Sequence, residues 1–193
     1  INELLVRLAF QGINVTRLKG GDPLIFGRGG EEIDALRQAG ISCACIPGIT
    51  AAQGAASSML TPLTHRGLAT GLRYVTGHRA ANASLNLDWQ SLASEDTTLV
   101  VYMGASTIGE ISNELISHGL PAATPVLAIV SATQHAEKRV PTTLGMVGST
   151  ELHAARDEPV LFIIGKVAAV TGVFTDTTSL VENLRERHAL ALA

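Results

Sequence analysis

Residues 15–32 read Val-Thr-Arg-Leu-Lys-Gly-Gly-Asp-Pro-Leu-Ile-Phe-Gly-Arg-Gly-Gly-Glu-Glu, and they are the most informative part of the chain. A short apolar segment runs into two glycines, an aspartate and a proline, and a second glycine-rich turn leads to an acidic helix start. Adjacent glycines adopt positive φ and let a ligand approach the backbone, while proline fixes the direction in which the chain leaves. Because open α/β sheets bind ligands at the carboxyl ends of their strands, this stretch predicts a ligand-binding loop.

Amphipathic and apolar segments alternate along the rest of the chain. The pattern predicts helices over residues 2–11, 29–39, 51–58 and 106–118. It predicts strands over residues 13–18, 42–46, 72–76, 98–103, 125–130, 137–144 and 160–164, with 137–144 at an edge. Residues 78–96 are predicted to be loop-like, anchored by Trp89. This alternation is typical of the α/β class, with a parallel or mixed sheet covered on both faces.

The elements predict two domains and a tail. Residues 1–68 are predicted to form the C-terminal part of a first α/β domain, residues 69–172 a second, and residues 173–193 a helical tail, with a helix over 179–192. The first domain holds only two expected strands, and its first helix starts in mid-pattern at Ile1, without an initiator methionine. We therefore expect an N-terminally truncated chain.

Composition limits the class of protein. Hydrophobic residues make up 46% of the 193 residues and aromatic residues only 4%, which predicts an aliphatic core. The net charge of −3 argues against a nucleic-acid partner. No apolar run approaches the roughly 18 residues of a membrane-spanning helix, so we expect a soluble protein without a membrane partner.

The cysteines and histidines predict no metal site. Cys43 and Cys45 are too few for a disulfide framework, and on a strand they would share one face. We expect them to be buried as small apolar side chains rather than to form a redox or metal site, in a reducing cytoplasm. The histidines show no spacing typical of metal ligands.

Three loops at predicted strand ends could meet at a small-molecule site, namely residues 20–23, 47–51 and 102–104. Taken alone, each is more often an ordinary turn, helix entry or core segment; together they favour a site in a cleft between the domains. The chain has neither Gly-x-Gly-x-x-Gly nor a Gly-Lys-Ser/Thr loop, so nucleotide phosphates are not expected. Basic residues near the first loop suit either a polycarboxylate ligand or simple solvation: Arg17, Lys19, Arg28 and, later, Arg66.

Residues 17–23, followed by Phe-Gly-Arg-Gly at 26–29 and two glutamates at 31–32, resemble the signature of the uroporphyrinogen-III C-methyltransferases, within the tetrapyrrole methylases. Residues 47–51, 62–66 and 102–104 fall in the same order and spacing as in that family. The resemblance covers roughly residues 1–170. The same sequence type forms the C-terminal module of sirohaem synthase.

The resemblance implies a two-domain, non-Rossmann methyltransferase fold, here with its first domain incomplete, that binds S-adenosylmethionine between domains. It implies methylation of uroporphyrinogen III at C2 and C7 to give precorrin-2, for sirohaem or cobalamin biosynthesis, by a cytoplasmic homodimer without a metal. The implied cofactor contacts are Gly20, Gly21, Asp22, Ile25, Thr50, Ala51, Met103 and Ala132. Arg17 and Arg28 would bind substrate carboxylates. The family's acid–base residues would lie upstream of Ile1, so no catalytic residue is assigned.

The sequence departs from the family pattern at two places. Leu24 stands where phenylalanine is usual, and residues 131–133 read Ser-Ala-Thr where Asn-Gly-Thr is common. Three alternative readings remain open. The chain is another precorrin methyltransferase, a catalytically incomplete fragment that only binds, or an α/β domain without a cofactor.

Overall fold

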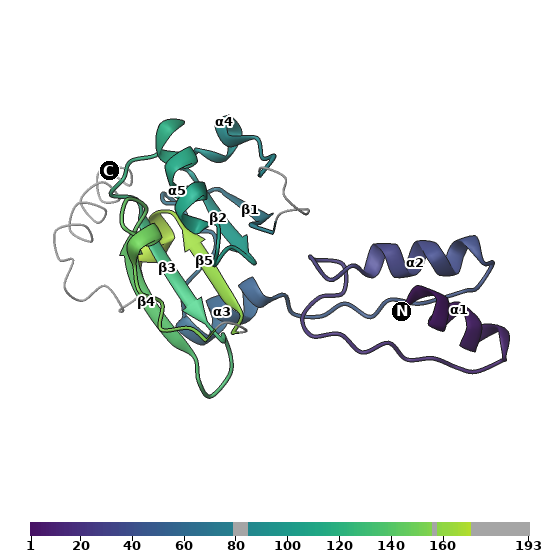
Figure 1. Cartoon of the computed structure of the whole chain (residues 1–193). Helices are drawn as coiled ribbons and strands as arrows, with labels where there is room; N and C mark the ends of the chain where they lie inside the picture. The colour runs from purple at the N-terminus through teal and green to yellow at the C-terminus, as the bar shows by residue number, and fades with distance from the viewer. Residues whose placement is uncertain (79–84, 156–157, 171–193) are drawn as a thin grey trace. The chain divides into compact units, whose positions relative to one another are not determined.

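The computed structural model describes residues 1–78, 85–155 and 158–170 (Figure 1). The chain separates into two compact units, residues 1–51 and the residues from Ala52 onward. This division precedes the boundary expected between residues 68 and 69, because helix α3 (Ala51–Met59) packs with the sheet of the second unit. The helical tail expected over 173–193 lies outside the described residues.

The first unit contains two helices, α1 (Asn2–Phe10) and α2 (Gly29–Gln38), as the sequence predicts. Glu31 and Glu32 occupy the first turn of α2, where a negative charge is favoured by the helix dipole. The side-chain amide of Asn2 donates a hydrogen bond to the carbonyl oxygen of Glu31 at 3.4 Å. This contact joins the start of α1 to the start of α2.

The strands predicted at residues 13–18 and 42–46 are wrong. Both segments lack regular secondary structure. A strand exists only through ladder hydrogen bonds to a neighbour, and neither segment has such a neighbour among the described residues. Their apolar side chains are consequently exposed, with Leu18 at 81% and Ile46 at 80% of full accessibility.

The predicted burial of Cys43 and Cys45 is also wrong. Both are free thiols and both are exposed. They lie in the 42–46 segment, so the same absence of a pairing strand that exposes Ile46 leaves them uncovered.

The second unit is built on a five-stranded sheet in the order β1-β2-β5-β3-β4. Its strands are β1 (Gly71–Thr76), β2 (Thr97–Tyr102), β3 (Pro125–Val130), β4 (Lys138–Thr143) and β5 (Val160–Ile164). β1 and β2 are parallel, whereas β5 is antiparallel to β2 and to β3, and β4 is antiparallel to β3. The expected mixed sheet is thereby confirmed, with β4 at its edge.

Both faces of the sheet are covered (Figure 1). One face packs against α4 (Trp89–Leu92), α5 (Ile108–Ser117) and the short 3-10 helix η1 (Val147–Ser149). The other packs against α3 and the 3-10 helix η2 (Lys166–Val170). Side chains alternate between the faces, so Val101 joins the first cluster and Val100 the second. Trp89 packs against the first cluster, as the sequence predicts.

No helix within the described ranges is long and apolar enough to cross a membrane.

Candidate functional site

Asp22 joins two of the three predicted ligand loops. Its Oδ1 accepts a hydrogen bond from the amide of Leu24 at 2.8 Å, and its Oδ2 accepts one from the amide of Gly48 at 3.1 Å. The amide of Ile25 in turn donates to the carbonyl oxygen of Asp22 at 3.3 Å. The carboxylate therefore shapes its own turn and ties residues 20–25 to residues 47–51.

The two loops touch through glycine backbones. Gly21 adopts φ +73°, which favours glycine, and a Cβ added at Gly48 would overlap the carbonyl group of Gly21. A Cβ at Gly20, by contrast, would meet no atom within 4 Å. The loop thus combines a close backbone contact on one side with open space beside Gly20, where a ligand could approach the chain.

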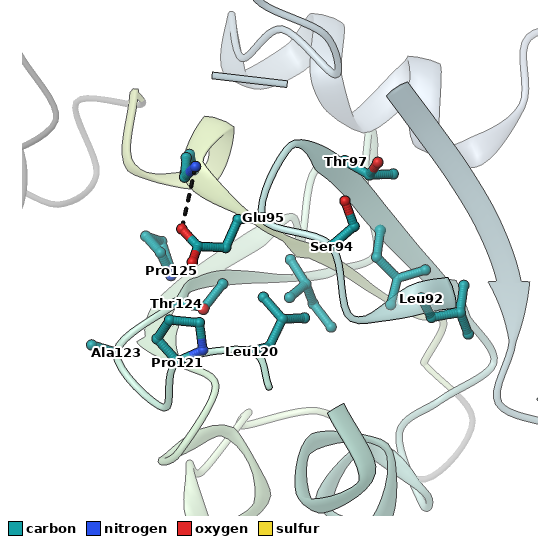
Figure 2. A pocket seen from close by; sticks show the side chains of 13 residues that line it. Leu92, Ser94, Glu95, Thr97, Leu120, Pro121, Ala123, Thr124 and Pro125 are labelled. Atoms are coloured by element: carbon teal, nitrogen blue, oxygen red, sulfur yellow. Dashed lines mark ion pairs between the residues drawn. The ribbon is translucent and has the colours of Figure 1, made fainter. Parts of the chain in front are cut away.

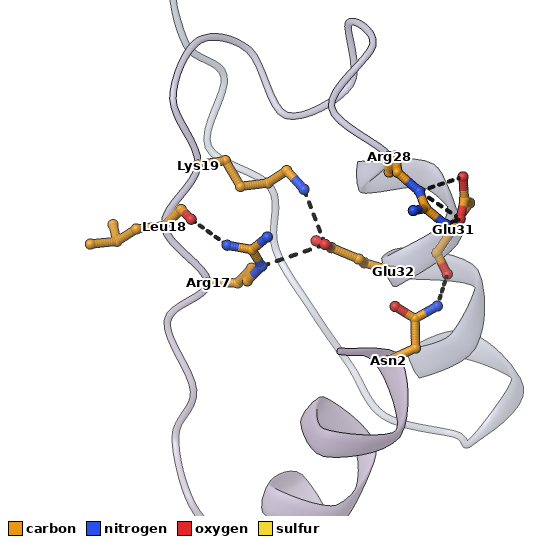
Figure 3. Close-up of polar contacts among 7 residues, drawn as sticks. All are labelled: Asn2, Arg17, Leu18, Lys19, Arg28, Glu31 and Glu32. Carbon is orange, nitrogen blue, oxygen red and sulfur yellow. Dashed lines mark hydrogen bonds and ion pairs between the residues drawn. The ribbon is translucent and has the colours of Figure 1, made fainter. Parts of the chain in front are cut away.

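A cluster of charges lies beside this loop (Figure 3). Glu32 Oε1 lies 3.0 Å from Lys19 Nζ and 3.4 Å from Arg17 Nε. The side chains of Lys19 and Glu32 are each only 12% exposed. The hydrogen bond from Lys19 outweighs partial burial and, with the charges of Lys19 and Arg17, holds the pKa of Glu32 below its usual value.

Arg28 forms a second ion pair at the start of α2. Its φ of +59° is in the left-handed region, and its Nη2 lies 2.6 Å from Glu31 Oε2 (Figure 3). The hydrogen bond between the two lowers the pKa of Glu31 and raises that of Arg28. Arg17 and Arg28 both line a polar hollow of about 570 Å³. The structure therefore brings the two predicted substrate arginines together, each paired with a glutamate.

The predicted site residues of the second unit lie at one end of the sheet. β2 and β3 run in the same direction on either side of β5. Met103 directly follows β2, is 50% exposed and has φ +53°. Ala132 follows β3, between Ser131 at φ +49° and Thr133 at φ +67°. Left-handed residues other than glycine are strained, and such strain clusters at functional sites.

The start of α3 reaches the same end of the sheet. The amide of Ala52 donates a hydrogen bond to the phenolic oxygen of Tyr102 at 3.1 Å, and the ring of Tyr74 meets that of Tyr102 edge-on at 5.6 Å. One amide at the amino end of α3 is therefore bonded within the protein. Thr50 and Ala51, both predicted cofactor contacts, directly precede Ala52.

Two side chains that shape this end of the sheet, those of Tyr102 and Glu137, were not expected from the sequence to have a role. Tyr102 was expected at the end of the strand over 98–103, as the first residue of the third ligand loop, without a role for its hydroxyl group. Glu137 was not singled out, although its carboxylate accepts a hydrogen bond from the amide of Thr133 at 2.6 Å and forms an ion pair with Arg139 at 2.7 Å. The available signal was a short polar run after a buried strand, in which Glu137 and Arg139 are two residues apart on one face.

A second hollow, of about 180 Å³, lies at the opposite end of the sheet (Figure 2). Its lining comes from the starts of β2 and β3 and the end of β5, and Lys166 pairs there with Glu95 at 3.3 Å. None of the predicted site residues lines it. Within the described ranges, no three His, Cys, Asp or Glu side chains are grouped to hold a metal ion.

Comparison with known proteins gives several matches. Residues 1–148 match the family model of the Tetrapyrrole (Corrin/Porphyrin) Methylases. The chain is 58% identical over 170 residues to a uroporphyrinogen-III C-methyltransferase of Paracoccus denitrificans, covering 88% of this chain and 59% of that protein. It is 45% identical over 170 residues to siroheme synthase 2 of Serratia proteamaculans, covering 88% of this chain and 36% of that protein.

The fold matches solved structures as well. A uroporphyrin-III C-methyl transferase from Thermus thermophilus, complexed with S-adenyl homocysteine, aligns with a TM-score of 0.75 and 38% identity, covering 88% of this chain and 73% of that one. The chain spans about three-fifths or less of the length of these curated relatives. The family model, the sequence identity and the fold agree, and this chain belongs to the tetrapyrrole methylase family.

Proposed function

We propose that this chain is part of an S-adenosylmethionine-dependent C-methyltransferase that methylates uroporphyrinogen III at C2 and C7 to give precorrin-2. The observation that carries the proposal is the 58% identity over 170 residues with the uroporphyrinogen-III C-methyltransferase of Paracoccus denitrificans. The product would serve sirohaem or cobalamin biosynthesis, and the identity to siroheme synthase 2 supports the first of these.

The proposed methyl donor fits the residues present. The Thermus relative is complexed with S-adenyl homocysteine, which is the donor after loss of its methyl group. Open space beside Gly20 leaves the glycine backbone accessible, and Met103 presents an exposed thioether side chain in a strained turn. The proposed contacts are Gly20, Gly21, Asp22, Ile25, Thr50, Ala51, Met103 and Ala132.

Asp22 would contribute mainly by holding the backbone of the two ligand loops in place. Both its carboxylate oxygens already accept hydrogen bonds from backbone amides, so its main effect is to hold the two loops together. A carboxylate oxygen has a second lone pair, which leaves it able to accept a hydroxyl or ammonium proton of the donor.

Arg17 and Arg28 are the proposed partners of the substrate carboxylates. They line one hollow, which supports a shared ligand, and guanidinium groups bind carboxylates through paired hydrogen bonds. In this structure Glu32 and Glu31 occupy that role. Substrate carboxylates would therefore have to compete with two internal ion pairs, of which the exposed Arg28–Glu31 pair is the weaker obstacle.

In the proposed methyl transfer, the main contribution of the protein is to align the methyl donor with the substrate. S-Adenosylmethionine, when bound, supplies an electrophilic methyl group on a positively charged sulfur. The residues of this chain would hold that group in line with the nucleophilic pyrrole carbon and exclude water. A base must also remove the proton that the methylated carbon loses; we assign this role to no residue of the chain.

A methyl-transfer assay tests the proposal. The protein is incubated without oxygen with methyl-labelled S-adenosylmethionine and uroporphyrinogen III, and the products are analysed by mass spectrometry. Addition of one and then two methyl groups is expected. In a parallel incubation with later precorrins, transfer to one of these and not to uroporphyrinogen III would indicate another precorrin methyltransferase. Donor binding without transfer would indicate a binding-only fragment, and no binding would indicate a domain without this cofactor.

We also propose that the protein acts as a cytoplasmic homodimer. Exposed free thiols at Cys43 and Cys45 suit a reducing compartment, and homodimers are what the family resemblance implies. Light scattering after size-exclusion chromatography gives the mass in solution, and a monomeric mass at micromolar concentration would contradict the dimer.

A further inference from the structure

The turn that follows β3 is held in a costly backbone conformation. Ser131 has φ +49° and Thr133 has φ +67°. For a β-branched residue such as threonine the left-handed region is unusual, and each such residue costs on the order of 1–3 kcal/mol. Some contact outside the turn must therefore stabilise it.

Glu137 supplies that contact. Its Oε2 accepts a hydrogen bond from the amide of Thr133 at 2.6 Å, and its Oε1 accepts one from Nε of Arg139 at 2.7 Å. The Glu137 side chain is only 11% exposed. Both carboxylate oxygens are thus engaged, one by the strained turn and one by a cation.

Arg139 extends the contact to α3. Its Nη2 donates a hydrogen bond to the carbonyl oxygen of Ser58, in the last turn of that helix, at 2.9 Å. The turn also touches the middle of the helix, since a Cβ added at Gly54 would lie 3.2 Å from Cγ2 of Thr133. The turn therefore meets α3 at two places, directly at Gly54 and, through Glu137 and Arg139, at Ser58.

The charge of Glu137 is retained at neutral pH. Partial burial alone would raise the pKa of this carboxyl, but the amide of Thr133, Arg139 and Ser58 together hold the pKa below its usual value. A carboxylate that accepts a backbone amide and a guanidinium group forms strong, charge-assisted hydrogen bonds. Such bonds can hold a strained turn.

We propose that Glu137 is a positioning residue that keeps residues 131–133, and Ala132 with them, in the conformation that receives the methyl donor. This inference rests on the proposed function, in which Ala132 contacts S-adenosylmethionine. The proposal assigns Glu137 no contact with the donor or the substrate. It acts by preforming the turn, so that donor binding need not bear the cost of ordering it.

Two substitutions and a control test this proposal in the full-length protein. Glu137→Ala removes both hydrogen bonds of the carboxylate. Glu137→Gln keeps an acceptor for the amide of Thr133 but removes the charge that faces Arg139. Glu151→Ala is the control, because Glu151 is 81% exposed and its ion pair is with His153.

The first readout is the dissociation constant of S-adenosylhomocysteine, measured by calorimetry beside the melting temperature. Glu137→Ala is expected to weaken binding about tenfold. This factor corresponds to the free energy that donor binding would have to supply to hold one residue in the strained conformation. Glu137→Gln should recover part of this loss, and Glu151→Ala should bind as the wild type does. A lower melting temperature with unchanged affinity would overturn the proposal, because Glu137 would then only stabilise the fold.

The second readout does not depend on a ligand. Hydrogen exchange at the amide of Thr133 should accelerate in Glu137→Ala and stay slow in Glu151→Ala. Unchanged exchange would overturn the proposal even if affinity fell. If the wild type binds no S-adenosylhomocysteine, the proposed function fails and the donor-binding role fails with it. If the wild type binds and both Glu137 variants bind equally well, only the role of Glu137 fails.

Discussion

The phenolic oxygen of Tyr102, the last residue of β2, accepts a hydrogen bond from the amide of Ala52 at 3.1 Å and so caps the start of α3. This bond is buried. It satisfies one of the amides that every helix leaves unpaired at its amino end, and it joins the strand that precedes Met103 to the helix that follows Thr50.

Tyr102→Phe should therefore destabilise the protein by about 1–3 kcal/mol, because the amide of Ala52 would remain buried without a partner. Tyr74→Phe is the matched control, since its ring packs against that of Tyr102 and the substitution preserves this contact. The free energy of unfolding in urea measures both. Equal effects of the two substitutions would show that the hydroxyl of Tyr102 contributes nothing specific.

Gly48→Ala should disrupt the contact between the two loops of the first unit. Its Cβ would overlap backbone atoms of Gly21, which cannot move aside as a flexible side chain could. Gly30→Ala is the control, because a Cβ there meets no atom within 4 Å and alanine favours a helix. We expect Gly48→Ala to weaken S-adenosylhomocysteine binding at least about tenfold, whereas Gly30→Ala leaves it unchanged. Calorimetry gives both affinities.

Asp22→Ala should weaken binding of the same ligand, because it removes the acceptor for the amides of Leu24 and Gly48. Asp34→Ala serves for comparison, since Asp34 forms an exposed ion pair with Arg37 on α2. The circular dichroism spectrum should be alike in both variants. If Asp22→Ala keeps wild-type affinity, Asp22 has no part in a cofactor site.

Arg28→Ala should raise KM for uroporphyrinogen III, or lower kcat, without changing the affinity for S-adenosylhomocysteine. The reason is that Arg28 is proposed to bind substrate carboxylates and lies in the polar hollow with Arg17. Steady-state kinetics and calorimetry separate the two effects. An equal loss of substrate and cofactor binding would instead assign Arg28 a structural role at the start of α2.

The lowered pKa of Glu32 predicts how the free energy of unfolding depends on pH. Its pKa is lowered from an ordinary value of 4.5, chiefly by the hydrogen bond from Lys19. A carboxyl whose pKa is lower in the folded state stabilises the protein fully above its unfolded pKa and loses this contribution as pH falls through the folded pKa.

Wild-type protein should accordingly lose more stability than Glu32→Gln when the pH is lowered from about 6 to about 3. The amide cannot ionise, so its contribution is constant across this range. Urea unfolding at several pH values compares the two proteins. Parallel curves would show that the contact between Lys19 and Glu32 does not stabilise the fold.

Sequence reasoning correctly predicted the buried strands that are uniformly apolar and have clear boundary residues. Residues 125–130 and 160–164 are short apolar runs bounded by proline or glycine, and both are fully buried strands. Residues 13–18 and 42–46 have a similar pattern. Such a pattern indicates a local preference for extended backbone, but it does not indicate whether a neighbouring strand is present to pair with it. Local sequence also places Arg17 and Arg28 near one loop, and the Arg28–Glu31 pair is itself local, three residues apart. The pairing of Arg17 with Glu32 depends instead on how α2 packs.

The role of Glu137 was beyond sequence reasoning for a different reason. Its partners include Ser58, through Arg139, and these residues lie far apart along the chain. The spacing of Glu137 and Arg139 signals that the two side chains can pair, but it does not distinguish a carboxylate that holds a strained turn from one that is merely solvated. Only the left-handed backbone of Thr133 and the buried carboxylate beside it make that distinction.

The order of the sheet has a consequence for how the chain folds during its synthesis. β5 is the last of the five strands along the chain, yet it lies between β2 and β3. Until residues 160–164 leave the ribosome, the strands of this sheet can form only two separate pairs, β1 with β2 and β3 with β4. Each pair then presents an unpaired edge of the kind that invites aggregation. The inner strand arrives last, and its arrival joins the two halves of the sheet in one late step.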